Sequence, residues 1–420
     1  TKKTLMLFFY RTITFFFLII SPFLVFYRII NKKEDAKRFL EKFGKFKKNK
    51  IKGKIIWFHG SSVGEIMSVL PLVEKLEDRN DINQILITSN TYSSSKILSK
   101  FKLKKTIHQF FPLDISFIIK KFLNHWKPAV AIFIESEIWP NTIIEIKKKN
   151  IPLILINARI TEKSFNKWIK LRSLSKFLFK KFDLCLPQNK ETIKYLRLLG
   201  AKKINKIGNL KYSESKEEKE KDLKPNLQKY FSRKKIILGA ISTHQSEELI
   251  CAKVHTYQKK IWKNSITLII PRHVHRASEI ISGLAKYKLN IHLHSSKKFP
   301  KKNIDIYLVD TFGETKLFTK NCNLVFLGGS LINHGGQNPL EAARSGCKIL
   351  HGPHIENFKD VYSFLSKFNI SKKITGYSEL NNEVSKNLRT KIKSKKNFLK
   401  IRKIGKKILD QNYKKISNYL

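Results

Sequence analysis

The sequence predicts an α/β protein with two Rossmann-like domains facing a cleft, preceded by an N-terminal membrane-anchor helix. Three observations support this prediction. Residues 5–30 are mostly apolar, short apolar runs then alternate with helix-length segments in two series, and a charged stretch, 213–228, separates the series. Short apolar runs separated by helices are typical of βα units and parallel sheets. The 420 residues are enough for two large domains.

The first expected element is a helix within residues 1–31. Its apolar part would be roughly 39 Å long at 1.5 Å per residue, which exceeds the bilayer core of about 30 Å. Lys32 and Lys33 follow directly and favour a cytoplasmic position for the rest of the chain. Basic residues near the start of the helix favour the opposite orientation, or a helix lying in the membrane interface.

The remaining boundaries follow from the strand pattern. We expect a first domain over 32–212, a linker over 213–228, a second domain over 229–386 and an amphipathic C-terminal helix over 387–420. The strands of the first domain are expected at 55–58, 85–88, 130–134, 153–156 and 184–186. Those of the second domain are expected at 236–238, 266–270, 304–309, 324–327 and 349–350.

Composition restricts the partners less sharply. With 84 Lys+Arg against 32 Asp+Glu, the formal net charge is +52. A polyanion partner is one interpretation, and codon bias is the other, since the lysines are spread nearly everywhere. The four cysteines are scattered without a CxxC pair, which favours thiols in a reducing compartment over disulfides or a zinc site.

A glycine-rich loop over 328–342, GGSLINHGGQNPLEA, follows an apolar run at 323–327. Its glycines can hold positive φ and let backbone amides approach a ligand. Pro339 suits the first turn of a helix, whose amides form an anion site, and Glu341 fits as an acceptor for sugar hydroxyls. Together these features indicate a sugar-nucleotide site at the carboxyl end of an open sheet. The alternative is a turn without a ligand.

In the first domain, Gly60 and Gly64 permit a tight turn after the first strand, and Glu65 falls near a helix start. The helix dipole is expected to lower the pKa of Glu65, leaving an ionised base for an attacking hydroxyl. The alternative is a purely capping role. Glu135 and Glu137 follow the third strand and suit a polyhydroxylated ligand, or they cap the next helix.

Cationic and hydroxyl side chains follow other strands. Arg159 could hold a carboxylate or phosphate in a bidentate fork, or pair with a neighbouring glutamate. In the second domain, hydroxyls, a fixed cation and imidazoles at strand ends suit a phosphate-bearing nucleotide. Neither a DxD pair after a strand nor a Cys/His cluster with metal spacing occurs in the sequence, so we expect metal-independent chemistry without a cofactor.

Eight segments, in this order, resemble one family, the bacterial 3-deoxy-D-manno-octulosonic acid (Kdo) transferases. The similarity extends from about Trp57 to about Phe358, and any one of the segments alone is weak. The segments are WFHGSSVGE (57–65), ESEIWPN (135–141), NARITEKS (157–164), GNLKY (208–212), STHQSEE (242–248), IPRHVHR (270–276), DTFGE (310–314) and GGSLINHGGQNPLEAA (328–343).

The resemblance implies a GT-B fold with an acceptor domain at 32–212 and a nucleotide-sugar donor domain at 229–386. It also implies inverting transfer of Kdo from CMP-Kdo to a lipid A precursor (lipid IVA) in lipopolysaccharide core biosynthesis. The enzyme would act on the cytoplasmic side of the inner membrane, against its anionic surface. We expect no nucleic-acid partner, because the chain lacks aromatic–basic recognition motifs.

The family's site residues carry over onto matching positions. Glu65 matches the general base. The expected acceptor-binding residues are Ser62, Gly64, Glu137 and Arg159. The expected donor-binding residues are Lys211, Ser242, Thr243, Arg272, His273, Gly329, Ser330, Asn338 and Glu341.

The departures from the family pattern are mild. Gly60 and Ser61 replace an alanine pair, Gln337 stands where histidine is usual, and Val274–His275 replaces Pro-Glu. These changes affect the expected donor contacts more than the base.

Two other functions remain possible from the sequence. One is another GT-B protein with a uridine donor, such as a lipid-disaccharide synthase or a sugar-nucleotide epimerase. The other is a membrane-tethered polybasic protein that binds RNA or anionic lipid, for which binding would depend steeply on salt.

Overall fold

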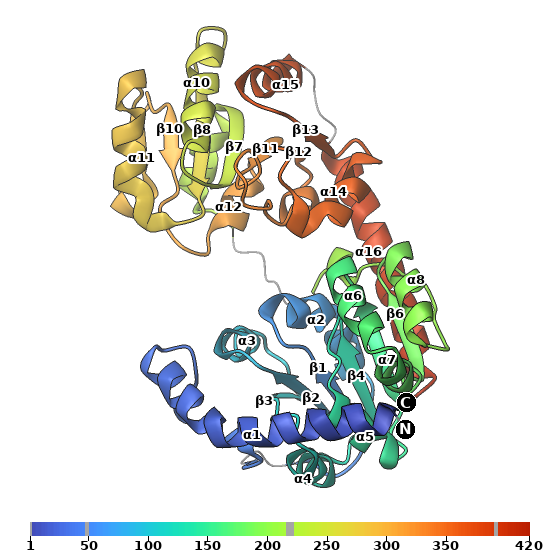
Figure 1. Cartoon of the computed structure of the whole chain (residues 1–420). Helices are drawn as coiled ribbons and strands as arrows, with labels where there is room; N and C mark the ends of the chain where they lie inside the picture. Colours follow the sequence, from blue (N-terminus) through green and yellow to red (C-terminus); the bar gives the residue numbers. More distant parts are fainter. Residues whose placement is uncertain (1, 47–49, 216–221, 390–393) are drawn as a thin grey trace. The chain divides into compact units, whose positions relative to one another are not determined.

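The computed structural model describes residues 2–46, 50–215, 222–389 and 394–420, and the chain divides into two compact units (Figure 1). The first unit is Thr1–Glu218 with Ile404–Leu420, and the second is Lys219–Lys403. Each contains one parallel sheet with helices. The boundary falls within the expected linker, of which residues 216–221 lie outside the described residues.

The first unit contains six parallel strands in the order β3-β2-β1-β4-β5-β6. Five of them were expected, and each of these five is buried at every position, which is why it is a continuous apolar run in the sequence. The sixth, the edge strand β3, was not expected, because its sequence, TIHQF, is partly polar. The strands are β1 Ile55–His59, β2 Gln84–Ser89, β3 Thr106–Phe110, β4 Val130–Ile134, β5 Leu153–Ala158 and β6 Leu184–Pro187.

Helices connect these strands in the sequence. They are α2 Val63–Glu77, α3 Tyr92–Leu98, α4 Ser116–Trp126, α5 Pro140–Lys148, α6 Glu162–Lys170, α7 Arg172–Phe179 and α8 Lys190–Leu199, with short 3-10 turns η1 Phe39–Phe43 and η2 Leu210–Tyr212.

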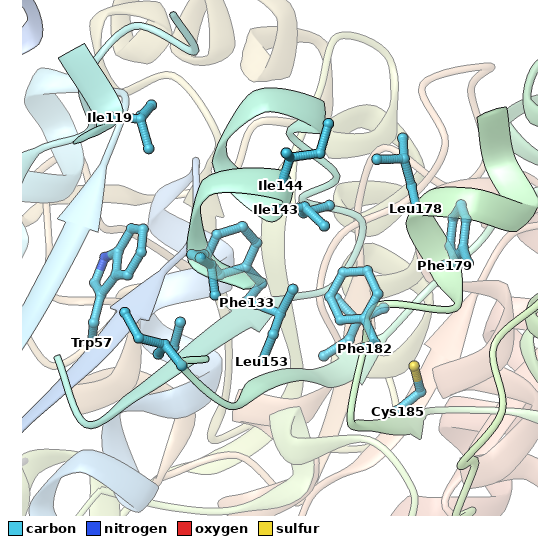
Figure 2. Packing of buried hydrophobic residues seen from close by; sticks show 14 of the residues in the cluster. Trp57, Ile119, Phe133, Ile143, Ile144, Leu153, Leu178, Phe179, Phe182 and Cys185 are labelled. Atoms are coloured by element: carbon cyan, nitrogen blue, oxygen red, sulfur yellow. The ribbon is translucent and has the colours of Figure 1, made fainter. Parts of the chain in front are cut away.

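The core of the first unit joins sheet residues to α5 and α7, and Figure 2 shows part of it. Phe133 of β4 is fully buried, as are Ile143 of α5 and Phe179 of α7. Burial of a side chain of this size stabilises the fold by roughly 1.5–3 kcal/mol. Cys185 lies in the same cluster as a free thiol, and burial raises its pKa to about 12. All four cysteines are buried and free, which confirms the expectation of thiols.

The second unit contains seven parallel strands in the order β13-β12-β11-β7-β8-β10-β9. The five strands expected from apolar runs are present, and the two edge strands were missed because each has only three residues. The strands are β7 Lys235–Thr243, β8 Ser265–Pro271, β9 Ile291–Leu293, β10 Ile306–Leu308, β11 Leu324–Leu327, β12 Lys348–His351 and β13 Ser371–Lys373.

The helices α9 to α15 of the second unit have between 5 and 13 residues. They are α9 Pro225–Ser232, α10 Glu247–Lys259, α11 Ala277–Leu284, α12 Thr315–Thr319, α13 Leu340–Arg344, α14 Lys359–Ser366 and α15 Tyr377–Arg389. The 3-10 turns are η3 Val274–Arg276, η4 Ala285–Tyr287, η5 His294–Ser296 and η6 Glu356–Phe358.

Helix α1, Lys2–Ile30, is long and apolar enough over Thr4–Ile30 to cross a membrane. One side of α1 is hydrogen-bonded to other residues of the first unit. The Tyr10 hydroxyl donates to Asp114 Oδ2 at 2.7 Å, and Arg11 Nε donates to Asn141 Oδ1 of α5 at 3.2 Å. Much of the remaining apolar surface is exposed, including Phe8, Phe9, Ile13, Phe15, Phe16, Ile19, Ile20, Phe23 and Phe26.

The last helix, α16 Ser394–Ser417, begins in the second unit and ends in the first. Its contact with the first unit is close at Gly405, where an added Cβ would lie 2.2 Å from the carbonyl oxygen of Tyr212. Ser213 Oγ also donates to Gly405 O at 2.9 Å. The expected tail over 387–420 therefore contains the end of α15 and this helix, whose second half packs on the first unit.

Candidate active site

Glu137 is the centre of a hydrogen-bonded group at the carboxyl ends of β1 and β4. Its Oε2 accepts from His59 Nε2 at 3.1 Å, from Ser61 Oγ at 2.7 Å and from Trp139 Nε1 at 2.7 Å. Burial acts to raise the pKa of Glu137, but these donors and the charge of His59 together hold it below its ordinary value. Glu137 is therefore an ionised carboxylate at neutral pH.

Glu65 lies close by at the start of α2, where Ser62 is the N-cap residue. Ser61 N donates to Glu65 Oε2 at 2.7 Å and Ser62 Oγ donates to Oε1 at 2.9 Å. This arrangement is close to a capping box, so the capping role considered above is present. Both serines belong to the same strand-to-helix turn as the carboxylate.

The expected lowering of the Glu65 pKa is wrong. Burial raises the pKa of Glu65 to about 7, and repulsion from Glu137 adds to the effect, while the hydrogen bonds from Ser61 and Ser62 only reduce it. Loss of hydration therefore outweighs the hydrogen bonds that the helix start offers to this carboxylate. A carboxylate with a pKa near 7 is a better general base at neutral pH than an ordinary glutamate.

Two residues of this group were not predicted from the sequence as site residues. His59 is fully buried, its Nδ1 lies 3.0 Å from Thr88 Oγ1, and its ring stacks on Phe111 with a centroid distance of 3.7 Å. Asn90 Nδ2 donates to Ser61 Oγ at 2.7 Å. A polar residue directly after a buried apolar run is the sequence feature that could have identified His59.

Neither Glu135 nor Glu137 caps the helix that follows them, so that alternative is wrong. The first amides of α5 are satisfied by Asp114, which accepts from Asn141 N at 3.0 Å and from Thr142 N at 2.7 Å. Both glutamates are thus available for other roles.

Glu135 pairs instead with Lys211, whose Nζ lies 2.6 Å from Glu135 Oε1. Lys211 was expected among the donor-binding residues, yet it belongs to the first unit. Arg159 N donates to Glu135 O at 3.2 Å. The Arg159 guanidinium makes no ion pair with any residue that the structure describes, so the alternative that it pairs with a glutamate is wrong.

In the second unit a buried carboxylate, Glu247, organises the glycine loop. Its oxygens accept from the amides of His244 at 3.0 Å, Gly329 at 2.8 Å, Leu331 at 3.1 Å and Ser330 at 3.2 Å. Glu247 thereby joins the turn after β7 to the turn after β11. This role was not predicted from the sequence, because Glu247 resembles an ordinary acidic residue in the first turn of a helix.

This arrangement changes what the glycine loop offers to a ligand. The amides of Gly329 and Ser330 already donate to Glu247, and the Ser330 hydroxyl donates to Leu327 O and accepts from Gly352 N at 2.8 Å. Gly328 does not have positive φ, unlike Gly329. It is required because a Cβ there would lie 2.5 Å from the carbonyl oxygen of Ser242.

An arginine and several histidine side chains lie at the carboxyl ends of β7 and β8. Arg272 and His273 are exposed, and Arg272 N donates to Thr243 O at 3.0 Å. The His244 ring lies 5.8 Å from that of His273 and 4.2 Å from that of His334. Burial, followed by the electrostatic effect of His334, His273, Arg276 and Arg272, lowers the pKa of His244 to about 4. This turn can bind an anion, because Arg272 makes no ion pair within the described ranges.

The helix expected near Pro339 is confirmed, although α13 has only five residues and Pro339 is its N-cap. Asn338 Oδ1 accepts from Leu340 N at 3.1 Å, so Asn338 itself satisfies one of the first amides. Glu341 is exposed in the first turn.

The structure thus divides the expected site residues between the two units. The first unit contains Ser62, Gly64, Glu65, Glu137, Arg159 and Lys211, and the second contains Ser242, Thr243, Arg272, His273, Gly329, Ser330, Asn338 and Glu341. Among the residues described, no group of three or more His, Cys, Asp or Glu side chains could hold a metal ion.

Solved structures share this fold over most of the chain. A glycosyltransferase of kitacinnamycin has a TM-score of 0.54 at 11% identity, covering 88% of this chain and 100% of its own. UDP-GlcNAc 2-epimerase from Neisseria meningitidis, bound to UDP-GlcNAc, has a TM-score of 0.55 at 12% identity, covering 87% and 99%. Two parallel-sheet α/β units of this type, with their polar groups at the strand ends, define a GT-B protein, the fold of many glycosyltransferases.

The family follows from the sequence relatives. Residues 37–214 match the family model of 3-deoxy-D-manno-octulosonic-acid transferase (kdotransferase). The 3-deoxy-D-manno-octulosonic acid transferase of Rickettsia bellii (strain RML369-C) is 33% identical over 415 residues, which is 98% of this chain and 99% of the relative. The chain belongs to the Kdo transferase family, as its motifs predicted.

Proposed function

We propose that this glycosyltransferase moves Kdo from CMP-Kdo to a lipid A precursor (lipid IVA), with inversion and without a metal, in lipopolysaccharide core biosynthesis. The observation that carries the proposal is the pair of carboxylates in the first unit. One, Glu137, is held ionised by three donors, and the other, Glu65, has a pKa raised to about 7. The family assignment supplies the sugar.

Glu65 acts as the general base. It takes the proton of an acceptor hydroxyl while the hydroxyl oxygen forms a bond to the anomeric carbon of Kdo. The bond between that carbon and the phosphate oxygen breaks, and CMP leaves with the electron pair. The transition state has oxocarbenium character, as in other glycosyl chemistry. Glu137 stays ionised, and its negative charge keeps Glu65 basic enough for the transfer.

The second unit stabilises the leaving nucleotide. Arg272 and His273 offer exposed donors to its phosphate, beside the turn that contains Ser242 and Thr243. Prearranged donors of this kind stabilise the charge that develops on a leaving group. The fixed cation replaces the charge that a metal ion would supply, which is the reason for proposing metal-independent transfer.

The first unit binds the acceptor. The half-buried guanidinium of Arg159 makes no ion pair within the part of the chain that the structure describes. Guanidinium groups match phosphate geometry with two parallel hydrogen bonds. A lipid A precursor carries phosphates, so Arg159 is suited to fix it near Glu65.

Helix α1 attaches the enzyme to the inner membrane from the cytoplasmic side. Tyr10 and Arg11 bind residues of the first unit, so α1 lies along that unit and exposes phenylalanines on another side. This arrangement favours a helix in the membrane interface over one that crosses the bilayer. The anionic lipid surface would attract the basic residues of the neighbouring α7, Arg172 and Lys176, and its C-cap residue Lys180.

The test uses membranes that contain the full chain, incubated with CMP-Kdo and tetraacylated lipid A precursor. The product mass should rise by whole Kdo residues. CMP should compete with the donor more strongly than UDP does. Preference for UDP would favour the rival assignment to a uridine-dependent GT-B enzyme, and an unchanged acceptor mass would contradict Kdo transfer.

A further inference from the structure

A line of polar side chains connects the end of α1 to Glu137 in the first unit. At the inner end of this line, the Ser61 hydroxyl donates to Glu137 Oε2 and accepts from Asn90 Nδ2, and both distances are 2.7 Å. A serine hydroxyl has one hydrogen and can also accept. Because Asn90 supplies the donor that Ser61 accepts, the single hydrogen of Ser61 points toward Glu137.

Asn90 is held in turn by Lys42 of η1. Lys42 Nζ donates to Asn90 O at 3.3 Å and to Glu34 Oε2 at 2.6 Å. The Glu34 side chain is fully buried, and the Lys42 side chain is 12% exposed. Arg28, in the last turn of α1, donates through Nε to the same Glu34 oxygen at 3.3 Å. Consecutive hydrogen bonds therefore join the end of the apolar helix to a carboxylate of the candidate active site.

Ser61 is the point at which this line meets both carboxylates of the first unit. Its backbone N–H donates to Glu65 Oε2 at 2.7 Å, while its hydroxyl donates to Glu137 Oε2. Ser61 also stands where the family pattern has alanine. The hydroxyl is therefore a feature of this chain, and alanine suits the backbone of this turn.

We propose that Asn90 and Lys42 are positioning residues for the transfer reaction. They turn the Ser61 hydroxyl toward Glu137 and so fix the separation of Glu137 and Glu65. This inference rests on the proposed function, in which one carboxylate takes the proton and the other tunes it. The interaction between two charges varies inversely with their distance, so a displaced Glu137 would tune Glu65 less well. The rate of transfer depends on the two positioning residues, and donor affinity does not.

The first test follows Glu137 without substrate, through the indole N–H of Trp139, which donates to Glu137 Oε2 at 2.7 Å. NMR spectra of the full-length protein with isotope-labelled tryptophan are recorded in detergent, and Trp139→Phe identifies the signal. Ser61→Ala should shift this signal, because the carboxylate loses a donor. Asn90→Asp should shift it too, since the new side chain has nearly the same shape but accepts the Ser61 hydrogen and turns it away from Glu137.

The second test is kinetic and uses CMP-Kdo with the lipid A precursor. In Ser61→Ala and in Asn90→Asp, kcat should fall about tenfold, the size of one lost hydrogen bond, with an unchanged KM for the donor. Lys42→Met should also lower kcat, but Ser61→Ala/Lys42→Met should be no slower than Ser61→Ala, because both residues act through one hydroxyl. The control Lys147→Met removes an ion pair with Asp183 at the start of β5 and should retain both kcat and the NMR signal.

The contrary outcomes are distinct. Independent, multiplicative losses of kcat in Ser61→Ala/Lys42→Met would overturn the proposal, since the two residues would then act separately. An unshifted Trp139 signal with a normal kcat in Asn90→Asp would also overturn it. If the NMR shifts occur but the unmodified protein transfers no Kdo, the proposed function is refuted and the positioning of Glu137 by this line of residues is supported.

Discussion

The two units share one sheet design but have opposite chemistry at their strand ends. In the first unit the strand ends carry the carboxylates Glu65 and Glu137, whose partners include hydroxyl and imidazole side chains. In the second unit they carry Arg272 and His273, and the buried carboxylate Glu247 is turned inward to backbone amides. The difference separates two tasks of a transfer reaction, because accepting a proton needs a tuned base and releasing a nucleotide needs fixed positive charge.

The largest expected effect concerns the base of the first unit. Glu65→Gln keeps an oxygen for Ser61 N but cannot take a proton, so transfer should fall by about 10²–10⁴-fold. CMP affinity should not change, because the nucleotide is assigned to the second unit. Turnover assays and CMP titration measure the two quantities. Glu162→Gln, in the first turn of α6, is the matched control, and near-normal turnover in Glu65→Gln would remove this residue from the mechanism.

The pH dependence tests the same carboxylate without a mutation. Glu65 has a pKa raised to about 7 by burial and by Glu137. The base works only when deprotonated, so kcat/KM should fall about tenfold per pH unit below pH 7 and level off above it. The profile is measured in the unmodified enzyme and in Glu65→Gln, which should lack this limb. A limb centred near the ordinary glutamate pKa would contradict the effect of burial.

A pair of arginine variants tests whether the donor and the acceptor bind to different units. Arg272→Ala should weaken CMP binding about tenfold or more, as expected for a lost charge-assisted hydrogen bond, while the KM for acceptor stays unchanged. Arg159→Ala should raise the KM for acceptor and leave CMP affinity unchanged. Each variant is the control for the other. If both reduced CMP affinity alike, the assignment of the two ligands to separate units would be wrong.

The smallest expected effect concerns the inward-facing carboxylate. Glu247→Gln replaces an acceptor oxygen by an NH₂ group that faces backbone N–H groups, so an unsatisfied donor remains buried. The free energy of unfolding should fall by about 1–3 kcal/mol, with a modest loss of CMP affinity. Urea unfolding and CMP titration measure these changes. Glu279→Gln, on the exposed part of α11, should change stability much less, and equal effects would contradict the role of Glu247 in holding the loop.

The sequence predicted those strands whose residues are all buried. Fully buried strands are continuous apolar runs, so the central strands of both sheets were predicted. Edge strands were missed for two reasons. Strand β3 contains partly exposed polar residues, so it is not a continuous apolar run, and β9 and β13 have only three residues each. The glycine motifs and their order identified the fold and the family correctly.

The proposed site could be located from its motifs, but its contacts could not be predicted. Glu65 and Glu137 were named as candidates, yet the hydrogen bond between His59 and Glu137 joins residues 78 positions apart. The direction of the Glu65 pKa shift was wrong because a local rule about helix ends cannot account for burial by distant parts of the chain. The role of Glu247 was missed for the same reason, since its partners Gly329 and Ser330 are more than 80 positions away.

The attachment of α1 has a practical consequence for purification. The hydroxyl of Tyr10 binds Asp114, and the same carboxylate caps α5 through Asn141 N and Thr142 N. A version trimmed of its first thirty residues to improve solubility would leave Asp114 with one donor fewer and would uncover the surface that Met6 and Leu7 now shield. Detergent micelles or nanodiscs around the intact chain are therefore the suitable medium, because the apolar helix α1 is also part of the folded first unit.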